Sequence, residues 1–410
     1  IFTPAGTGAT IIETPTFADG QWVASTDALE LGMDYFVKFV FTPADSQAIE
    51  SPYSEMLTTV GVAKQRPGSF SSRMDMTISG YDGADTLENF PVLVRISSEV
   101  AATIEDKNEI RFISSDNTLL AYEIDTWNPA GESTIWVSIP QLSGTETAFT
   151  MVWNPIPGSN VHGALAPSRV WQNAGYVGVW HFNSQNADGS FADASGNSAT
   201  SVPVSSTHPG TIETEGTSAN GSTWHHVNAG VKVLPEDTTD WNFAETGYTT
   251  EAWMIPKTNF HRMFLYSDSN NAGNANAFGP TQIYVMSDDW ANAIWTSDII
   301  SQAVWRLVTT SWKGTSSPEG TSTTFYQNGI LIGSWGSKSA VSFINNGMGL
   351  TTGIYGNGSV NYPVDEIRVR RGTSTSAWTQ ANHDTQVVGT DFITYGDLIQ
   401  SSPATTIVIR

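Results

Sequence analysis

The strongest constraint on the fold of this 410-residue chain is the recurrence of short, β-branched apolar runs with almost no helical periodicity. No long stretch has apolar residues at i, i+3, i+4 and i+7, the spacing of an amphipathic helix. Short strands with turn signals at intervals of about 8–12 residues are typical of sandwiches and barrels. The sequence therefore predicts an all-β protein of tandem β-sandwich domains, with one short helix over Ser376–His383. The clearest strand runs are Tyr35–Phe41, Pro91–Ile96, Thr134–Ile139 and Ile367–Arg370.

Composition excludes several classes of function. The net charge of −22 argues against nucleic-acid binding, because a phosphate backbone needs clustered cations. No apolar run approaches the roughly 20 residues that span a bilayer, so we expect no direct membrane insertion. The absence of Cys excludes a disulfide scaffold and a thiol nucleophile. An acidic chain with 15 Trp and few Lys favours an extracellular or cell-surface location.

Shifts in composition divide the chain into three segments and a tail. Linker-like stretches rich in Pro and Gly lie near residues 64–68 and 153–158. The predicted segments are 1–65, 66–157 and 168–396, and the tail is 397–410.

The first segment carries a corner pattern of Leu, Gly and Tyr in Leu29–Val37. It resembles part of a fibronectin type III-like sandwich, in which such a Tyr bonds back to backbone. About 65 residues fall short of the roughly 100 of a full sandwich, so early strands are expected to be missing.

The second segment carries four short motifs in order: Phe90–Val94, Ile110–Phe112, Leu120–Ile124 and Ile135–Pro140. Together they resemble the bacterial domain of unknown function DUF2341. The resemblance implies a small β domain of exported proteins and implies no reaction.

The third segment resembles the laminin-G-like, concanavalin A-type jelly roll, and this resemblance implies the largest of the sandwiches. DUF2341 followed by this jelly roll is a familiar pairing. The matching motifs are Tyr176–Phe182, Phe191–Asn197, Tyr248–Met254, Phe325–Gly329 and Val364–Val369.

One carboxylate pattern raises the question of catalysis. Glucanases of the concanavalin-like fold use the carboxylates of Glu-x-Asp-x-x-Glu as nucleophile, helper and acid/base, and alternation along a strand places the first two on one face. Glu123 and Asp125 match, but Asn128 stands in the last place and cannot act as a general acid. The alternative is an edge-strand carboxylate pair beside a packed Trp. We predict no catalytic residues and no enzyme within these 410 residues.

A loop rich in oxygen donors predicts calcium as a structural cofactor. Hard cations take carboxylate, amide and carbonyl oxygens. Asp188, Asp193 and Asn197 lie in this loop, and the jelly-roll resemblance implies that the loop can hold a cation with Asp365 from the last strand nearby. The alternative is a solvated turn held by Asx hydrogen bonds.

A second polar segment predicts glycan binding. Trp290 and Trp295 lie between strands beside Asp288, Asp289 and Asn292. Trp with Asp and Asn is the combination that stacks on a sugar ring and bonds its hydroxyls. The alternative is a Trp that folds back over the core.

The tail ends in a strand-like run that includes Thr405, Ile407 and Ile409. Such a strand could complete the incomplete N-terminal sandwich of a neighbouring copy, or belong to the next repeat of a tandem array. The sequence thus predicts a modular structural and adhesive protein whose partners are other copies of itself and glycans. The alternatives are the carbohydrate-binding region of a larger secreted enzyme, the exported extension of a membrane complex, and a tail that pairs within its own chain.

Overall fold

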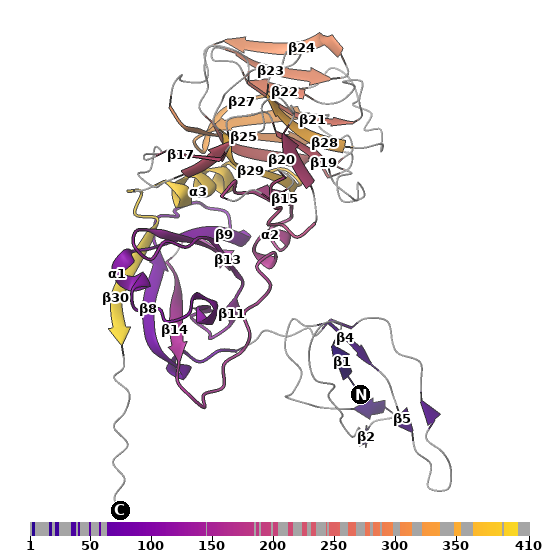
Figure 1. Cartoon of the computed structure of the whole chain (residues 1–410). Helices are drawn as coiled ribbons and strands as arrows, with labels where there is room; N and C mark the ends of the chain where they lie inside the picture. Colours follow the sequence, from indigo (N-terminus) through magenta and orange to yellow (C-terminus); the bar gives the residue numbers. More distant parts are fainter. Residues whose placement is uncertain are drawn as a thin grey trace, which may run out of the picture.

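The computed structural model describes side chains for residues 64–144, 146–183, 186–187, 190–197, 243, 246–254, 304–313, 323–334, 365–387 and 389–400, and further strands by their backbone alone (Figure 1). The elements so described are mostly strands, and every pairing among them is antiparallel. The prediction of an all-β fold is confirmed. No helix among the described residues is both long and apolar enough to cross a membrane.

The N-terminal segment contains short strands, of which the structure describes the backbone alone. They form a three-stranded sheet of order β1-β4-β7 and two strand pairs, β2-β3 and β5-β6. The predicted run Tyr35–Phe41 covers most of β4 and all of β5. The bounds are β1 (Phe2–Pro4), β2 (Thr16–Ala18), β3 (Gln21–Val23), β4 (Asp34–Val37), β5 (Val40–Phe41), β6 (Ile49–Glu50) and β7 (Leu57–Thr58).

Two sheets form what we call the small sandwich. The five-stranded sheet has the order β11-β10-β14-β8-β30, and the three-stranded sheet has the order β12-β13-β9. Apolar residues alternate with polar ones along β8, so one face of this strand is buried and the other faces solvent. The bounds are β8 (Phe70–Ile78), β9 (Leu87–Ile96), β10 (Arg111–Ser114), β11 (Leu119–Leu120), β12 (Tyr122–Thr126), β13 (Ser133–Leu142), β14 (Thr147–Pro155) and β30 (Ile393–Gln400).

Two larger sheets form the large sandwich. One runs β17-β18-β29-β20-β25-β26-β27, with β15 also paired to β29, and the other runs β16-β19-β28-β21-β22-β23-β24. The bounds in the first sheet are β15 (Tyr176–Trp180), β17 (Ile212–Glu215), β18 (Trp224–Val227), β20 (Tyr248–Met254), β25 (Arg306–Lys313), β26 (Ser322–Gln327), β27 (Ile330–Gly336) and β29 (Val364–Arg371). In the second they are β16 (Thr200–Pro203), β19 (Val231–Leu234), β21 (His261–Ser267), β22 (Ala275–Phe278), β23 (Gln282–Ser287), β24 (Asp289–Ser297) and β28 (Met348–Gly353).

The turn between β26 and β27 follows directly from its sequence. Asn328 and Gly329 have φ values of +51° and +76°. Two consecutive residues with positive φ form the turn that matches the twist of a two-residue hairpin, and Asn-Gly is its preferred sequence.

Short helices connect the strands, and the last of them, α3, packs where the two sandwiches meet. They are α1 (Ser98–Ala101), α2 (Arg169–Gln172) and α3 (Ser376–Gln386), with 3₁₀ turns at Pro67–Ser69 and Lys107–Glu109. The predicted helical turn is confirmed in α3, which begins where the Thr375 hydroxyl accepts a hydrogen bond from the Trp378 amide.

Strand β30 follows the large sandwich in sequence but belongs to the small one. It pairs with β8, from Ile393 opposite Ile78 to Gln400 opposite Ser72. The boundary that we predicted between residues 396 and 397 falls inside this strand. The chain therefore leaves the small sandwich, builds the large one and returns.

The returning segment also covers the open edge of β9. The Leu93 amide donates to the Thr385 hydroxyl at 2.9 Å, and the Arg95 amide donates to the Tyr395 hydroxyl at 2.9 Å. These amides lie in the row that β13 leaves unpaired. Pro91 lies in the same row, where its missing N–H costs no ladder hydrogen bond.

Among the described residues, the largest apolar cluster joins the small sandwich to the first strand of the large one and to the helices between them. It includes β8, β9 and β13 side chains together with α2, β15 and α3 side chains. Phe90 and Trp378 meet edge to face with ring centroids 4.9 Å apart, and the Arg370 guanidinium lies 3.8 Å from the Trp378 ring. Because α3 fills the core beside β9, the two sandwiches form one folded body.

We expect Trp378→Ala to destabilise both sandwiches together. Removing a buried Trp from a packed core costs about 3–5 kcal/mol of unfolding free energy. Chemical denaturation followed by near-UV circular dichroism should show one transition at a lower midpoint. Ile330→Ala is the matched control, since Ile330 is 63% exposed and a surface change costs within about 0.5 kcal/mol. Two separate transitions, with only one displaced, would contradict a core shared by the two sandwiches.

Candidate functional site

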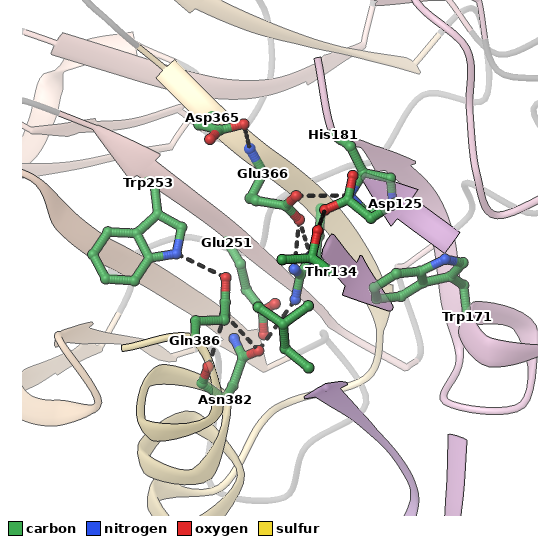
Figure 2. A network of polar contacts seen from close by, with 12 residues as sticks. Asp125, Thr134, Trp171, His181, Glu251, Trp253, Asp365, Glu366, Asn382 and Gln386 are labelled. Carbon is green, nitrogen blue, oxygen red and sulfur yellow. Dashed lines mark hydrogen bonds and ion pairs between the residues drawn. The ribbon is translucent and has the colours of Figure 1, made fainter. Parts of the chain in front are cut away.

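The most unusual chemistry lies where the two sandwiches meet. Charged and polar side chains from β12, β20, β29, α3 and the residue after β15 converge there in largely buried positions (Figure 2). We call this group the junction cluster. Its members are Glu123, Asp125, His181, Glu251, Asp365, Glu366, Arg368, Asn382 and Gln386.

Strand alternation brings the two carboxylates of β12 to one face. Glu123 and Asp125 are separated by one residue, and both carboxylates contact residues that follow β15, although the register with β13 shifts at Asp125. The Trp171 indole N–H donates to Glu123 Oε2. Asp125 accepts hydrogen bonds from the Thr134 hydroxyl at 3.2 Å and the Asn183 amide at 2.8 Å.

A bulge in β29 sets the position of the opposing carboxylate. Glu251 pairs with Arg368 and Trp253 with Asp365, so four residues of β29 lie opposite three of β20. Glu366 absorbs the mismatch with φ of +52°, in the left-handed region. Its carboxylate then reaches both His181 and Arg368.

His181 lies between carboxylates of the two sandwiches. Its Nδ1 is 2.7 Å from Glu366 Oε1, and its Nε2 is 3.4 Å from Glu123 Oε2. The ring stacks on Trp136 at an interplanar angle of 17°. Each nitrogen of the imidazole therefore faces an acceptor.

Arg368 is the buried cation of the junction cluster. Its Nη2 and Nε lie 2.5 and 3.1 Å from Glu366 Oε2, and its Nη1 lies 3.2 Å from Asn382 Oδ1. The guanidinium carbon lies 4.3 Å from the Trp136 ring and 4.9 Å from the Trp171 ring. This planar cation is held by ion pairing along its edge and by aromatic rings nearby.

Polar groups of α3 and β20 complete the network. The Gln386 amide donates to Asn382 Oδ1 at 3.0 Å, and the Trp253 indole donates to Gln386 Oε1 at 2.8 Å. The Tyr176 hydroxyl donates to Glu251 Oε2 at 3.0 Å. These bonds orient the groups around Arg368.

Burial and neighbouring charge displace the pKa values of the cluster in opposite directions. Burial raises the pKa of Asp125 to about 6, with His181 opposing the rise and the charges of Glu366 and Glu123 adding to it. Burial also acts to raise the pKa of Glu366, but the cations His181 and Arg368 outweigh it and lower that pKa to about 2. Glu366 is therefore ionised, while Asp125 holds its proton more readily than an exposed Asp.

Three further groups of the cluster have raised pKa values. Burial acts to lower the pKa of His181, but the carboxylates of Glu366, Asp125 and Glu123 raise it well above its usual value. Burial raises the pKa of Glu251, partly offset by Arg368. Burial raises the pKa of Asp365 well above its usual value, and the charges of Glu366 and Asp125 add to the effect.

The geometry of the cluster does not suit a metal ion. One ligand atom each from Asp125, His181 and Glu366 lie within 4.8 Å of one another. Ligands at about 2.0–2.2 Å from a Zn²⁺ ion would lie more than 3 Å apart around it. His181 Nδ1 and Glu366 Oε1 are 2.7 Å apart, a hydrogen-bond distance, and Arg368 occupies the other Glu366 oxygen. The distance between His181 Nδ1 and Glu366 Oε1 therefore suits a shared proton and is too short for two ligands of one metal ion.

The residues predicted to bind calcium have different neighbours. Asp193 Oδ1 accepts from the Val179 and Ser195 amides, both at 2.9 Å, and Oδ2 accepts from the Ser195 hydroxyl. The side-chain amide of Asn197 donates to the Ser195 hydroxyl at 3.2 Å. This is the Asx-type turn given above as the alternative. Asp365 is buried on β29, where its Oδ1 accepts from the Glu366 amide.

Asp188 lies outside the described residues, and so do Thr405, Ile407 and Ile409 of the tail. Calcium binding and strand complementation stay predictions.

The predicted glycan-binding segment is a strand, although we expected a connection between strands. Asp289, Trp290, Asn292 and Trp295 belong to β24, the last strand of the seven-stranded sheet, and Trp295 pairs with Tyr284. The reason is a hairpin with β23, which pairs with β24 from Gln282 opposite Ser297 to Ser287 opposite Asp289. Asp288 lies outside the described residues, and so do the side chains of β24.

Sequence reasoning found only part of the junction cluster. It singled out Glu123 and Asp125, and named Asp365 for a different site. It missed His181, Glu366 and Arg368, which enter the sequence motifs only as strand residues. The available signal was the density of charge in β29, where Asp365, Glu366, Arg368 and two further Arg interrupt a strand with buried apolar residues.

Comparisons with known proteins found similarity to solved structures and none to family models or curated sequences. No protein-family model matches the chain, and no curated protein matches its sequence. Among solved structures, the binding domain of Paraclostridial Mosquitocidal Protein 1 aligns with a TM-score of 0.37 at 14% identity, over 52% of each chain. The receptor binding domain of botulinum neurotoxin C/D mosaic serotype gives 0.38 and 12%, over 52% of this chain and 51% of that one. The Botulinum Neurotoxin Type G Receptor Binding Domain gives 0.36 and 11%, over the same shares.

This chain thus spans about half the length of the toxin domains that it matches. At TM-scores below 0.5 these similarities carry no argument about its ligand. The resemblances to DUF2341 and to the laminin-G-like jelly roll stay predictions.

We expect Arg368→Met to be strongly destabilising. Removing one partner of a buried ion pair costs about 3–5 kcal/mol. Adding Glu366→Gln to this variant should recover little of the loss, because the second change also removes the carboxylate that faces His181. Urea denaturation measures both changes. Lys64→Met is the control, because the Lys64–Asp116 pair is exposed and should leave the midpoint nearly unchanged. Equal effects of Lys64→Met and Arg368→Met would contradict the role of burial.

Proposed function

We propose that this chain is a modular structural and adhesive protein of an extracellular surface. The observation that carries the proposal is the junction, in which two sandwiches share a core, a returning strand and a buried ion-pair network. Such a junction resists hinge motion between the two sandwiches. A force on one sandwich is therefore transmitted to the other, and their relative orientation is kept. That property suits a protein that holds a binding surface away from its point of attachment.

The arrangement of strands supports a binding role for the large sandwich. Figure 1 shows β24 at one end of the two-sandwich body and β30, after which the chain continues to its C-terminus, at the other. A glycan-binding strand at β24 would face outward if the chain were held near residue 400. The net charge of −22 helps to keep such a surface protein soluble.

A fibre is the finer form of this proposal. In it, residues 405–409 of one copy complete the N-terminal sandwich of the next, and repeated head-to-tail contacts that do not close give a filament. The second candidate, a carbohydrate-binding region attached to a larger secreted enzyme, is favoured by the Trp and Asp content of β24 alone.

Glycan binding at β24 can be measured directly. A glycan array should show binding by the unmodified chain, with a loss of at least about fivefold for Trp290→Ala or Trp295→Ala, because stacking of a ring on an aromatic side chain contributes roughly 1–3 kcal/mol. Trp127→Ala is the control, since Trp127 lies in the small sandwich. No binding by the unmodified chain, or equal loss in the control, would end the adhesive interpretation of β24.

Electron microscopy tests the fibre. Filaments of the purified chain are expected, and deletion of residues 403–410 should abolish them because the donated strand is lost. Ser401→Ala is the matched control, since it lies outside the donated strand and should keep the filaments. Filaments that persist after the deletion would refute strand complementation while leaving the adhesive role to the glycan array.

A further inference from the structure

The groups around His181 come from every element that packs against it. From β29 it faces Glu366, with Arg368 and Asp365 nearby, and from β12 it faces Glu123 and Asp125. Trp136 of β13 and Trp171 of α2 lie against the ring, with centroids 6.4 and 5.4 Å away. His181 is therefore enclosed by carboxylates at its edge and by indoles at its faces.

The geometry favours the doubly protonated state of His181. Both ring nitrogens approach carboxylate oxygens, Nδ1 at 2.7 Å and Nε2 at 3.4 Å. A carboxylate only accepts, and a neutral imidazole has one donor and one lone pair. In the neutral ring one nitrogen would direct its lone pair at a carboxylate. The doubly protonated imidazolium satisfies both contacts.

The two carboxylates belong to different sandwiches. Glu123 lies on β12 of the small sandwich, and Glu366 lies on β29 of the large one. Without a cation between them these groups and Asp125 repel one another in a buried setting, where charge interactions are stronger than in water. The hydrogen bonds of the Arg368 guanidinium go to Glu366 of β29 and Asn382 of α3, and neither partner lies on β12. Among the described side chains, His181 is therefore the cation that joins the two strands.

We propose that His181 is a proton-operated clasp between the two sandwiches, closed when the imidazole is protonated and opened when it is neutral. The proposal rests on the junction geometry and is independent of the adhesive role. The folded chain binds this proton more tightly than the unfolded chain. The stabilisation is therefore present at low pH and is lost as pH rises through the raised pKa of His181.

The direct test is a ¹⁵N NMR titration of the histidine side chains in the full chain. His181 should remain doubly protonated well above the ordinary histidine pKa of about 6.5. Glu123→Gln should lower its titration midpoint by about one pH unit, because one opposing charge within contact distance is removed. Gln keeps an acceptor for the Trp171 indole, so the variant is expected to fold.

Thermal unfolding gives the second readout. Between about pH 6 and pH 9 the melting temperature of the unmodified chain should fall more steeply than that of His181→Gln. His162→Gln is the control, since the described hydrogen bonds of His162 use only its backbone, and it should retain the full slope. A His181 midpoint at or below 6.5, or an unmoved midpoint in Glu123→Gln, would overturn the clasp. If His181→Gln does not fold, the titration of the unmodified chain decides.

Discussion

The buried Arg368 guanidinium is the interaction on which the junction depends. A guanidinium keeps its charge in any folded protein, so it must be compensated wherever it is buried. Glu366 supplies the ion pair, and the rings of Trp136 and Trp171 lie within cation–π distance. Because Arg368 belongs to β29 while Trp136 belongs to β13, this one side chain links the large sandwich to the small one. The bulge at Glu366 is the local distortion that makes the pairing possible.

The return of the chain through α3 to β30 makes the small sandwich depend on contacts between distant residues. Strand β30, which pairs with β8, follows the large sandwich in sequence, so the small sandwich is built from both sides of the large one. Among the described strands, β30 is the last of its sheet and presents an open edge. A register shift between Tyr395 and Leu398, with Gly396 and Asp397 inside it, interrupts that edge. Bulges and charges of this kind disfavour pairing with a further strand.

The candidate site was only partly predictable, for reasons that individual residues make clear. Strand alternation is a local property, so the sequence alone assigns Glu123 and Asp125 to one face of a strand. The turn around Asp193 was also foreseeable, because Asp hydrogen-bonds to backbone two residues on. His181 could not be assigned to Glu366, because the two lie 185 residues apart and meet only through the pairing of β15 with β29.

The sequence by itself determined many of the elements: strand runs such as Pro91–Ile96 and Thr134–Ile139, and the short helix that begins at Ser376. Each depends on interactions among near neighbours in the chain. Only the tertiary structure decided where the elements go. The register of β30 on β8 and the bond from the Leu93 amide to Thr385, 292 residues away, depend on which edges and faces the rest of the fold leaves open. That information is shared across the whole chain and is carried by no local pattern.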